Sequence, residues 1–194
     1  MRAPCEVSVR ARARPLALAA LAGLAMAMAA PERTHAATAC AGSAVQPPEL
    51  THELAAAAVT CLLNQERRRR DLPRLRAVPR LERAAGRHAR DMVQRRFFAH
   101  TTPDGSSMSD RLRDVGYIDD ARSWAVGEAL AWGTGSRATP AGIVAAWLDS
   151  PPHRRVLLSA AYRDLGIGMT LGVPVGKFAG LPGATYAAEL GARS

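Results

Sequence analysis

The stretch AAWLDSPPHRR, residues 145–155, marks a change of direction in this chain. Its first half has the apolar spacing of a helix that packs Trp147 against a core. Pro151 and Pro152 stop that helix, because each proline fixes its own φ and lacks a backbone N–H. The chain should therefore present His153 on a rigid corner, where it could pack, bind or catalyse.

Mostly helices precede this stretch, and strands follow it. Apolar spacing and capping residues predict helices over the ranges 51–70, 79–96, 108–115 and 139–149. Residues 123–135, rich in glycine and tryptophan, should be extended or irregular. Residues 164–173 and 184–190 have the composition of strands. This order predicts an α+β fold, with helices packed on a small antiparallel sheet.

The bulk composition predicts one globular domain, since 48% of the 194 residues are apolar and 22% are charged. A basic start, an apolar run and small residues make residues 1–39 a secretory signal and processing region. Residues 40–50 form a polar arm, and residues 51–194 form the folded domain. The apolar run is shorter than the ~20 residues of a spanning helix, so we expect no membrane span in the mature chain. Lipid modification of Cys40 is the weaker alternative.

The chain carries a formal net charge of +9, and Lys177 is its only lysine. A high positive charge can indicate nucleic-acid binding, but the arginines are scattered along the chain, so we expect no nucleic-acid partner. The run Arg67–Arg70 suits the last turn of a helix and should be solvated. In the helix over 79–96, three arginines share the face opposite the apolar stripe: Arg83, Arg87 and Arg90.

Cysteine use fits an oxidising compartment. Cys5 leaves with the leader, and Cys40 and Cys61 remain as an even pair. We expect a disulfide that ties the polar arm to the first helix. The alternative is one loose cysteine and one buried cysteine.

Three polar residues stand at the ends of predicted elements: His100, Glu128 and His153. Histidine and carboxylate groups hold divalent metals, zinc above all, and they can also move protons. Their spacing alone does not show that they converge. His88 lies inside an apolar stripe and is expected to be a hydrogen-bonded core residue. Ser150 lacks the G-x-S-x-G surroundings of a nucleophile, so a serine hydrolase is not predicted.

Three segments appear in the order and spacing of one protein family. They read FFAHTTPDGSSMSDRLRDVGY (97–117), GEALAWGTG (127–135) and AAWLDSPPHRRVLLSAAYRDLGIGM (145–169). Over about residues 50–190 the chain resembles the CAP superfamily of cysteine-rich secretory proteins, antigen five and pathogenesis-related proteins. The opening stretch over 62–92 and the cysteine pair resemble its secreted bacterial SCP-like branch. The resemblance implies a three-layer α-β-α sandwich with a shallow cleft where histidines and acidic residues meet.

The resemblance also assigns residues to that cleft. His100 is similar to the first cleft histidine, His153 to the second, and Glu128 to the glutamate of a Gly-Glu-Asn motif. This implies that the three hold Zn²⁺ or another divalent cation. Ala129 replaces the asparagine of the motif, and Ser150 stands where many eukaryotic members have a second glutamate. We therefore expect modest metal affinity, with water completing the coordination.

Further residues are expected to line the cleft: Trp132, Asp149 and Ser150. We predict a secreted bacterial CAP-domain protein that binds a cation, an extracellular small molecule, a lipid, a peptide or a wall component. One alternative is a weak metal-dependent hydrolase that uses the same three residues to activate water. Another is an extracellular scaffold with a vestigial cleft.

Overall fold

A computed structural model describes residues 40–178 and 180–194. The secretory region predicted for residues 1–39 lies outside this part. The helices are α1 (His52–Arg68), α2 (Pro79–Arg95), α3 (Met108–Asp114), α4 (Pro140–Asp149) and α5 (Pro151–Leu157). The strands are β1 (Arg76–Ala77), β2 (Trp124–Thr134), β3 (Asp164–Leu171) and β4 (Gly183–Arg193).

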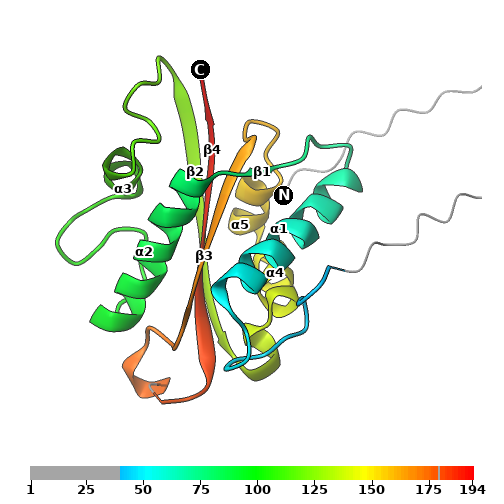
Figure 1. The fold of residues 1–194 in the computed structure, drawn as a ribbon, viewed down its shortest axis with the longest axis vertical. Coiled ribbons are helices and arrows are strands. Elements are labelled where there is room, and N and C mark those ends of the chain that lie inside the picture. The colour runs from blue at the N-terminus through cyan, green and yellow to red at the C-terminus, as the bar shows by residue number, and fades with distance from the viewer. Residues whose placement is uncertain (1–39, 179) are drawn as a thin grey trace, which may run out of the picture. The chain divides into compact units, whose positions relative to one another are not determined.

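The elements form three layers around one sheet. The strand order is β1-β3-β4-β2, so β2 lies at one edge. Helices α2 and α3 cover one face of the sheet, and α1, α4 and α5 cover the other (Figure 1). The predicted α-β-α sandwich is confirmed. The sheet is mixed rather than wholly antiparallel, because the two-residue β1 runs parallel to β3.

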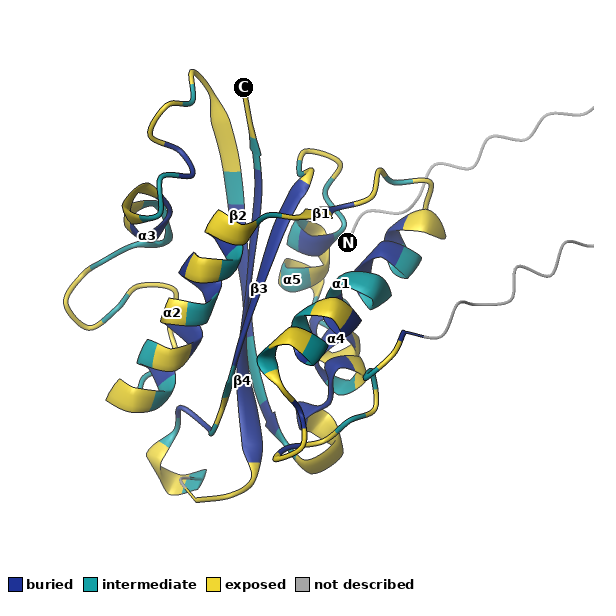
Figure 2. Cartoon of the chain, viewed as in Figure 1, coloured by how far each residue is buried: buried dark blue, intermediate teal, exposed yellow. Residues whose placement is uncertain are grey.

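Apolar side chains fill both spaces between the layers, and the buried residues in Figure 2 follow the inner faces of the helices. On the α1 and α4 side, Trp147 and Leu63 pack with Tyr186 of β4. On the α2 side, Met92 packs against Leu130 of β2. The sheet is therefore buried on both faces, and polar side chains can reach solvent mainly at its edges.

Two glycines bring α2 close to β3. A Cβ atom on Gly166 would lie 2.1 Å from the carbonyl carbon of Leu81, and one on Gly168 would lie 2.2 Å from that of Ala85. No larger residue fits where helix and strand backbones approach so closely. The inner face of α2 is thereby fixed against the sheet, and its opposite face is left to solvent.

The break in the chain after α4 is shorter than predicted. Ser150 is the single residue between α4 and α5, with φ −86° and ψ 114°. Pro151 then begins α5, because proline is tolerated in the first turn of a helix, where its missing N–H is not needed. His153 therefore lies in the first turn of a second helix and not on an irregular loop.

Cys40 and Cys61 form a disulfide, as predicted. The bond joins the N-terminal arm to α1. Because α1 packs on the sheet through residues such as Val59 and Leu63, the arm is anchored to the core.

One arginine of the run at the end of α1 is buried, so the prediction that the whole run is solvated was wrong for that residue. Arg67 is 0% exposed. It donates hydrogen bonds to the carbonyls of Pro73 (2.8 Å), Leu157 (2.8 Å) and Ser159 (3.0 Å). The carbonyl at the end of α5 carries negative partial charge, so a buried cation there is stabilised.

Candidate functional site

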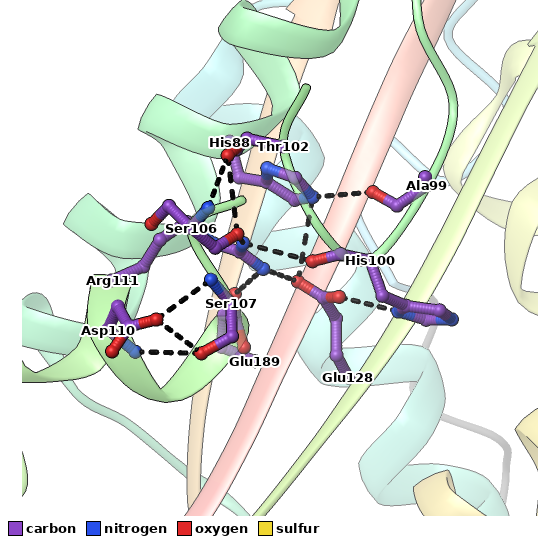
Figure 3. Close-up of polar contacts among 10 residues, drawn as sticks. All are labelled: His88, Ala99, His100, Thr102, Ser106, Ser107, Asp110, Arg111, Glu128 and Glu189. Carbon is purple, nitrogen blue, oxygen red and sulfur yellow. Dashed lines mark hydrogen bonds and ion pairs between the residues drawn. The ribbon is translucent and has the colours of Figure 1, made fainter. Parts of the chain in front are cut away.

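Two glutamates face each other on the side of the sheet covered by α2. Glu128 of β2 and Glu189 of β4 are direct cross-strand partners and are 8% and 0% exposed. Like charges in this position repel, so a buried pair needs a counter-charge. Arg111 of α3 supplies it, because its Nη2 lies 2.5 Å from Oε2 of Glu128 and 3.6 Å from Oε1 of Glu189 (Figure 3).

His100 lies against the same carboxylate from the loop that follows α2. That helix ends at Arg95, and the next residue, Arg96, turns the chain away from the helix axis with a φ of 57°. Nδ1 of His100 lies 2.5 Å from Oε1 of Glu128, and Arg111 donates a hydrogen bond to the His100 carbonyl at 3.0 Å. The side chain of His100 is nevertheless 62% exposed. The site therefore holds an exposed imidazole by its Nδ1 atom and leaves Nε2 available.

His88 supports this arrangement from inside α2, where it is buried as predicted. Its Nε2 donates a hydrogen bond to the carbonyl of Ala99 at 3.1 Å and lies 3.8 Å from Oε2 of Glu128 (Figure 3). Burial, followed by the nearby charge of Arg111, lowers the pKa of His88. A neutral His88 thus fixes the residue that precedes His100.

The surroundings move the pKa values of the two glutamates in opposite directions. Burial opposes ionisation of Glu128, but the hydrogen bond from His100 and the charge of Arg111 outweigh it, so its pKa is lowered. Burial and the charge of Glu128 raise the pKa of Glu189 well above its ordinary value. These opposite shifts favour a single negative charge on the pair, which Arg111 faces.

The two histidines of the predicted site come from different layers, His100 from the loop after α2 and His153 from the first turn of α5. The hydrogen bond to Glu128 raises the pKa of His100, although burial partly opposes it. Burial, and then the positive charge of His100, lower the pKa of His153. The charge of His100 thus influences His153, and their joint contact with one ligand stays a prediction. Because β2 is the edge strand, the loop after α2 and the start of α5 can reach this edge from opposite faces.

The predicted cleft residues are more widely distributed. Ser150 is half-buried at the corner between α4 and α5. Asp149 lines a hollow of about 500 Å³ that also includes Gln65 of α1. Trp132 of β2 packs against Phe178, with ring centroids 5.3 Å apart. Their assignment to a cleft around His100 stays a prediction.

The structure does not fit a three-ligand metal centre at this site. Within residues 40–178 and 180–194, no group of three or more histidine, cysteine, aspartate or glutamate side chains is placed to hold a metal ion. Both oxygens of Glu128 are already engaged, one by His100 and one by Arg111. Glu128 therefore orients His100, as carboxylates behind metal-binding histidines do, and is not a free ligand. Binding of Zn²⁺ or another divalent cation stays a prediction.

Two residues of this network were missed by the sequence reasoning. Arg111 stands among acidic neighbours in a short helix and so resembles an exposed, paired arginine. Glu189 is the one carboxylate in the otherwise apolar strand ATYAAEL, and that isolation was a usable signal. A charge inside a strand that is buried on both faces requires a partner.

Comparison with known proteins identifies a family match and more distant likenesses. Residues 61–176 match the model of the family described as "CAP: Cysteine-rich secretory protein family". The uncharacterized protein YkwD of Bacillus subtilis (strain 168) is 29% identical over 107 residues, which are 55% of this chain and 39% of that protein. The uncharacterized membrane protein YlbC of the same organism is 33% identical over 91 residues, 47% of this chain and 24% of that protein. The aligned parts thus span well under half the length of these relatives.

A solved structure shares the fold. It is the crystal structure of an extracellular protein containing a SCP domain from Bacillus anthracis str. Ames. It has a TM-score of 0.56 and 24% sequence identity, covering 72% of this chain and 40% of that one. Among the described helices of the present chain, none has the length and apolar character needed to cross a bilayer.

Proposed function

Because the chain belongs to the cysteine-rich secretory protein (CAP) family, we propose that it is secreted and works outside the cell by binding. The ligand is a small molecule, a lipid, a peptide or a wall component, and it contacts His100 and His153 at the β2 edge. The leader-like composition of residues 1–39 and the extracellular relative from Bacillus anthracis support secretion. The Cys40–Cys61 disulfide is consistent with an oxidising compartment.

The contact between His100 Nδ1 and Glu128 Oε1, at 2.5 Å, carries this proposal. A buried carboxylate fixes the ring, while more than half of the side chain is exposed. A group held in one orientation loses little freedom when a ligand binds, so its hydrogen bond contributes more fully to affinity. With its pKa raised, His100 is suited to an anionic or hydrogen-bond-accepting group of the ligand.

The same contacts favour binding over hydrolysis. The hydrolase alternative requires Glu128 to help activate water, and for that its carboxylate must be free to take a proton. Glu128 is occupied by His100 and Arg111, and Glu189 is buried, with a raised pKa that favours its neutral form. The network therefore orients a surface group, and neither of its two glutamates is free to activate water.

Calorimetric titration tests the proposal with two probes: zinc, and soluble fragments from a lysozyme digest of cell wall. We expect the wild type to bind at least one probe, and binding to be lost in both His100→Ala and His153→Ala. The exposed substitution Arg122→Ala, distant in sequence from both histidines, is the control and should leave binding unchanged. Binding of neither probe, or binding that both histidine variants retain, would contradict the proposal. Release of wall-fragment products that Glu128→Gln abolishes would support the hydrolase instead.

A further inference from the structure

The solvent face of α2 carries three arginines that the site above does not use. Arg83, Arg87 and Arg90 are exposed, and none makes a hydrogen bond or ion pair with another residue in the described part of the chain. Their spacing places them on successive turns of one helical face. With a rise of 1.5 Å per residue, they span about 10 Å along the helix axis.

These arginines line a hollow of about 430 Å³, which we call the arginine groove. His52 at the start of α1 and Met169 of β3 also line it, and both α1 and β3 lie beside α2 (Figure 1). Gly86 lies between the arginines along α2, and a Cβ atom there would meet nothing nearer than 4.0 Å, so the middle of the groove is open.

The charge of the groove is not neutralised by its surroundings. Glu82 is the one acidic residue in its lining, and it is paired with His52 at 3.2 Å. Asp91, the next acid along α2, is paired with Arg95 at 3.4 Å. Three neighbouring guanidinium groups with a single acid in the same lining repel one another, which weakens the helix slightly. An anionic ligand would remove that repulsion.

We propose that the arginine groove binds a linear anionic polysaccharide with a carboxylate on each sugar. A guanidinium group binds a carboxylate through two parallel hydrogen bonds. The ammonium group of lysine does not offer this paired geometry. A chain with regularly repeated carboxylates can meet arginines on successive helical turns. The hollow accepts the sugar rings, while the arginines at its rim hold the charges.

The lining of the groove argues against two other polyanions. A single-stranded nucleic acid gains much of its affinity by stacking bases on aromatic side chains, and no phenylalanine, tyrosine or tryptophan lines the groove. A membrane surface is bound by apolar side chains that project into it. Here the cationic surface is hollowed, and its apolar members, Pro79 and Met169, belong to the lining.

Calorimetric titration of the secreted protein with decagalacturonate at low salt tests this site. The triple variant Arg83→Gln, Arg87→Gln, Arg90→Gln should bind at least about tenfold more weakly than the wild type. The control, Arg68→Gln, Arg74→Gln, Arg137→Gln, removes the same charge from exposed arginines without side-chain partners elsewhere. It should change the affinity less than about twofold. The single variant Arg87→Gln should show an intermediate loss and provides a milder test of the same site.

Three results would overturn the proposal. The first is absence of decagalacturonate binding by the wild type. The second is equal weakening by the two triple variants, which would show that net charge alone attracts the polymer. The third is tighter binding of a single-stranded DNA oligonucleotide, or of phosphatidylglycerol vesicles, through the same three arginines.

Discussion

Two histidine–glutamate pairs in this molecule have the same chemistry and different surroundings. His100 and Glu128 are 2.5 Å apart, and their side chains are 62% and 3% exposed. His52 and Glu82 are 3.2 Å apart, and their side chains are 32% and 36% exposed. Glu128 is further bound to Arg111, whereas Glu82 has no second partner among the described residues.

The difference shows how burial of one carboxylate determines what the histidine beside it can do. Glu82 stays accessible to water, which can replace its contact with His52, so that contact contributes little to stability. Glu128 is cut off from water, so its hydrogen-bond donors, His100 and Arg111, must stay in place. The ring of His100 is oriented as a consequence. A rigid, polarised ring at the surface thus depends on charges buried behind it.

The largest expected effect comes from removing the buried counter-charge. Arg111→Met leaves Glu128 and Glu189 together without a cation, so the free energy of unfolding should fall by about 3–5 kcal/mol. Urea denaturation measures this. The control is Arg113→Met in the same helix, where Arg113 forms an exposed pair with Asp110, and it should cost less than about 1 kcal/mol. Equal losses in the two variants would refute the buried network.

The next largest effect separates the His100–Glu128 pair from the His52–Glu82 pair by the stability that each glutamate contributes. Glu128→Gln removes the charge that Arg111 and His100 require and should cost about 2 kcal/mol or more. Glu82→Gln removes the charge from the exposed pair and should cost at most about 0.5 kcal/mol. Thermal unfolding of both variants at one pH makes the comparison. If Glu82→Gln cost as much as Glu128→Gln, burial would not be the cause of the difference.

Glu189→Gln should act in the opposite direction. The raised pKa of Glu189 means that the folded protein keeps a proton that the unfolded chain releases above about pH 4.3. Taking up that proton lowers the free energy of unfolding at pH 7, and a neutral glutamine removes this loss. We expect the variant to gain about 1 kcal/mol or more at pH 7, and less at pH 4. A loss at pH 7 would show that the carboxyl is ionised in the folded protein.

The smallest expected effect is the pH dependence of the stability that His100 contributes to the folded protein. Because the pKa of His100 is raised in the folded state, its stabilisation is fully present below about pH 6.5 and is lost as the pH rises through the folded pKa. The exposed ring limits the size to less than about 1 kcal/mol. His100→Ala should therefore lose more stability at pH 5.5 than at pH 8. A larger loss at pH 8 would contradict the sign.

The sequence predicted the elements better than it predicted their pairing. The first helix, expected over 51–70, runs from His52 to Arg68, because apolar spacing and the Thr51 cap are local signals. Strand β1 was not predicted, because two exposed residues, Arg76 and Ala77, carry no pattern. Its parallel pairing with β3 depends on tertiary packing, which local signals do not contain.

For the site, the resemblance to a family supplied His100, Glu128 and His153, and spacing alone did not. Arg111 and Glu189 could not be found in this way, because their role depends on the register of β2 with β4 and on the docking of α3. That register places Glu128 and Glu189 opposite each other. No local pattern in either strand specifies it.

Nitrogen-15 NMR of the imidazole rings across pH 5–9 tests the central claim most directly. If the buried Glu128 holds His100, the neutral ring of His100 carries its proton on Nδ1 and its pKa lies above the ordinary 6.5. Both features should disappear in Glu128→Gln. A His100 ring protonated on Nε2, with an ordinary pKa that Glu128→Gln leaves unchanged, would contradict the account.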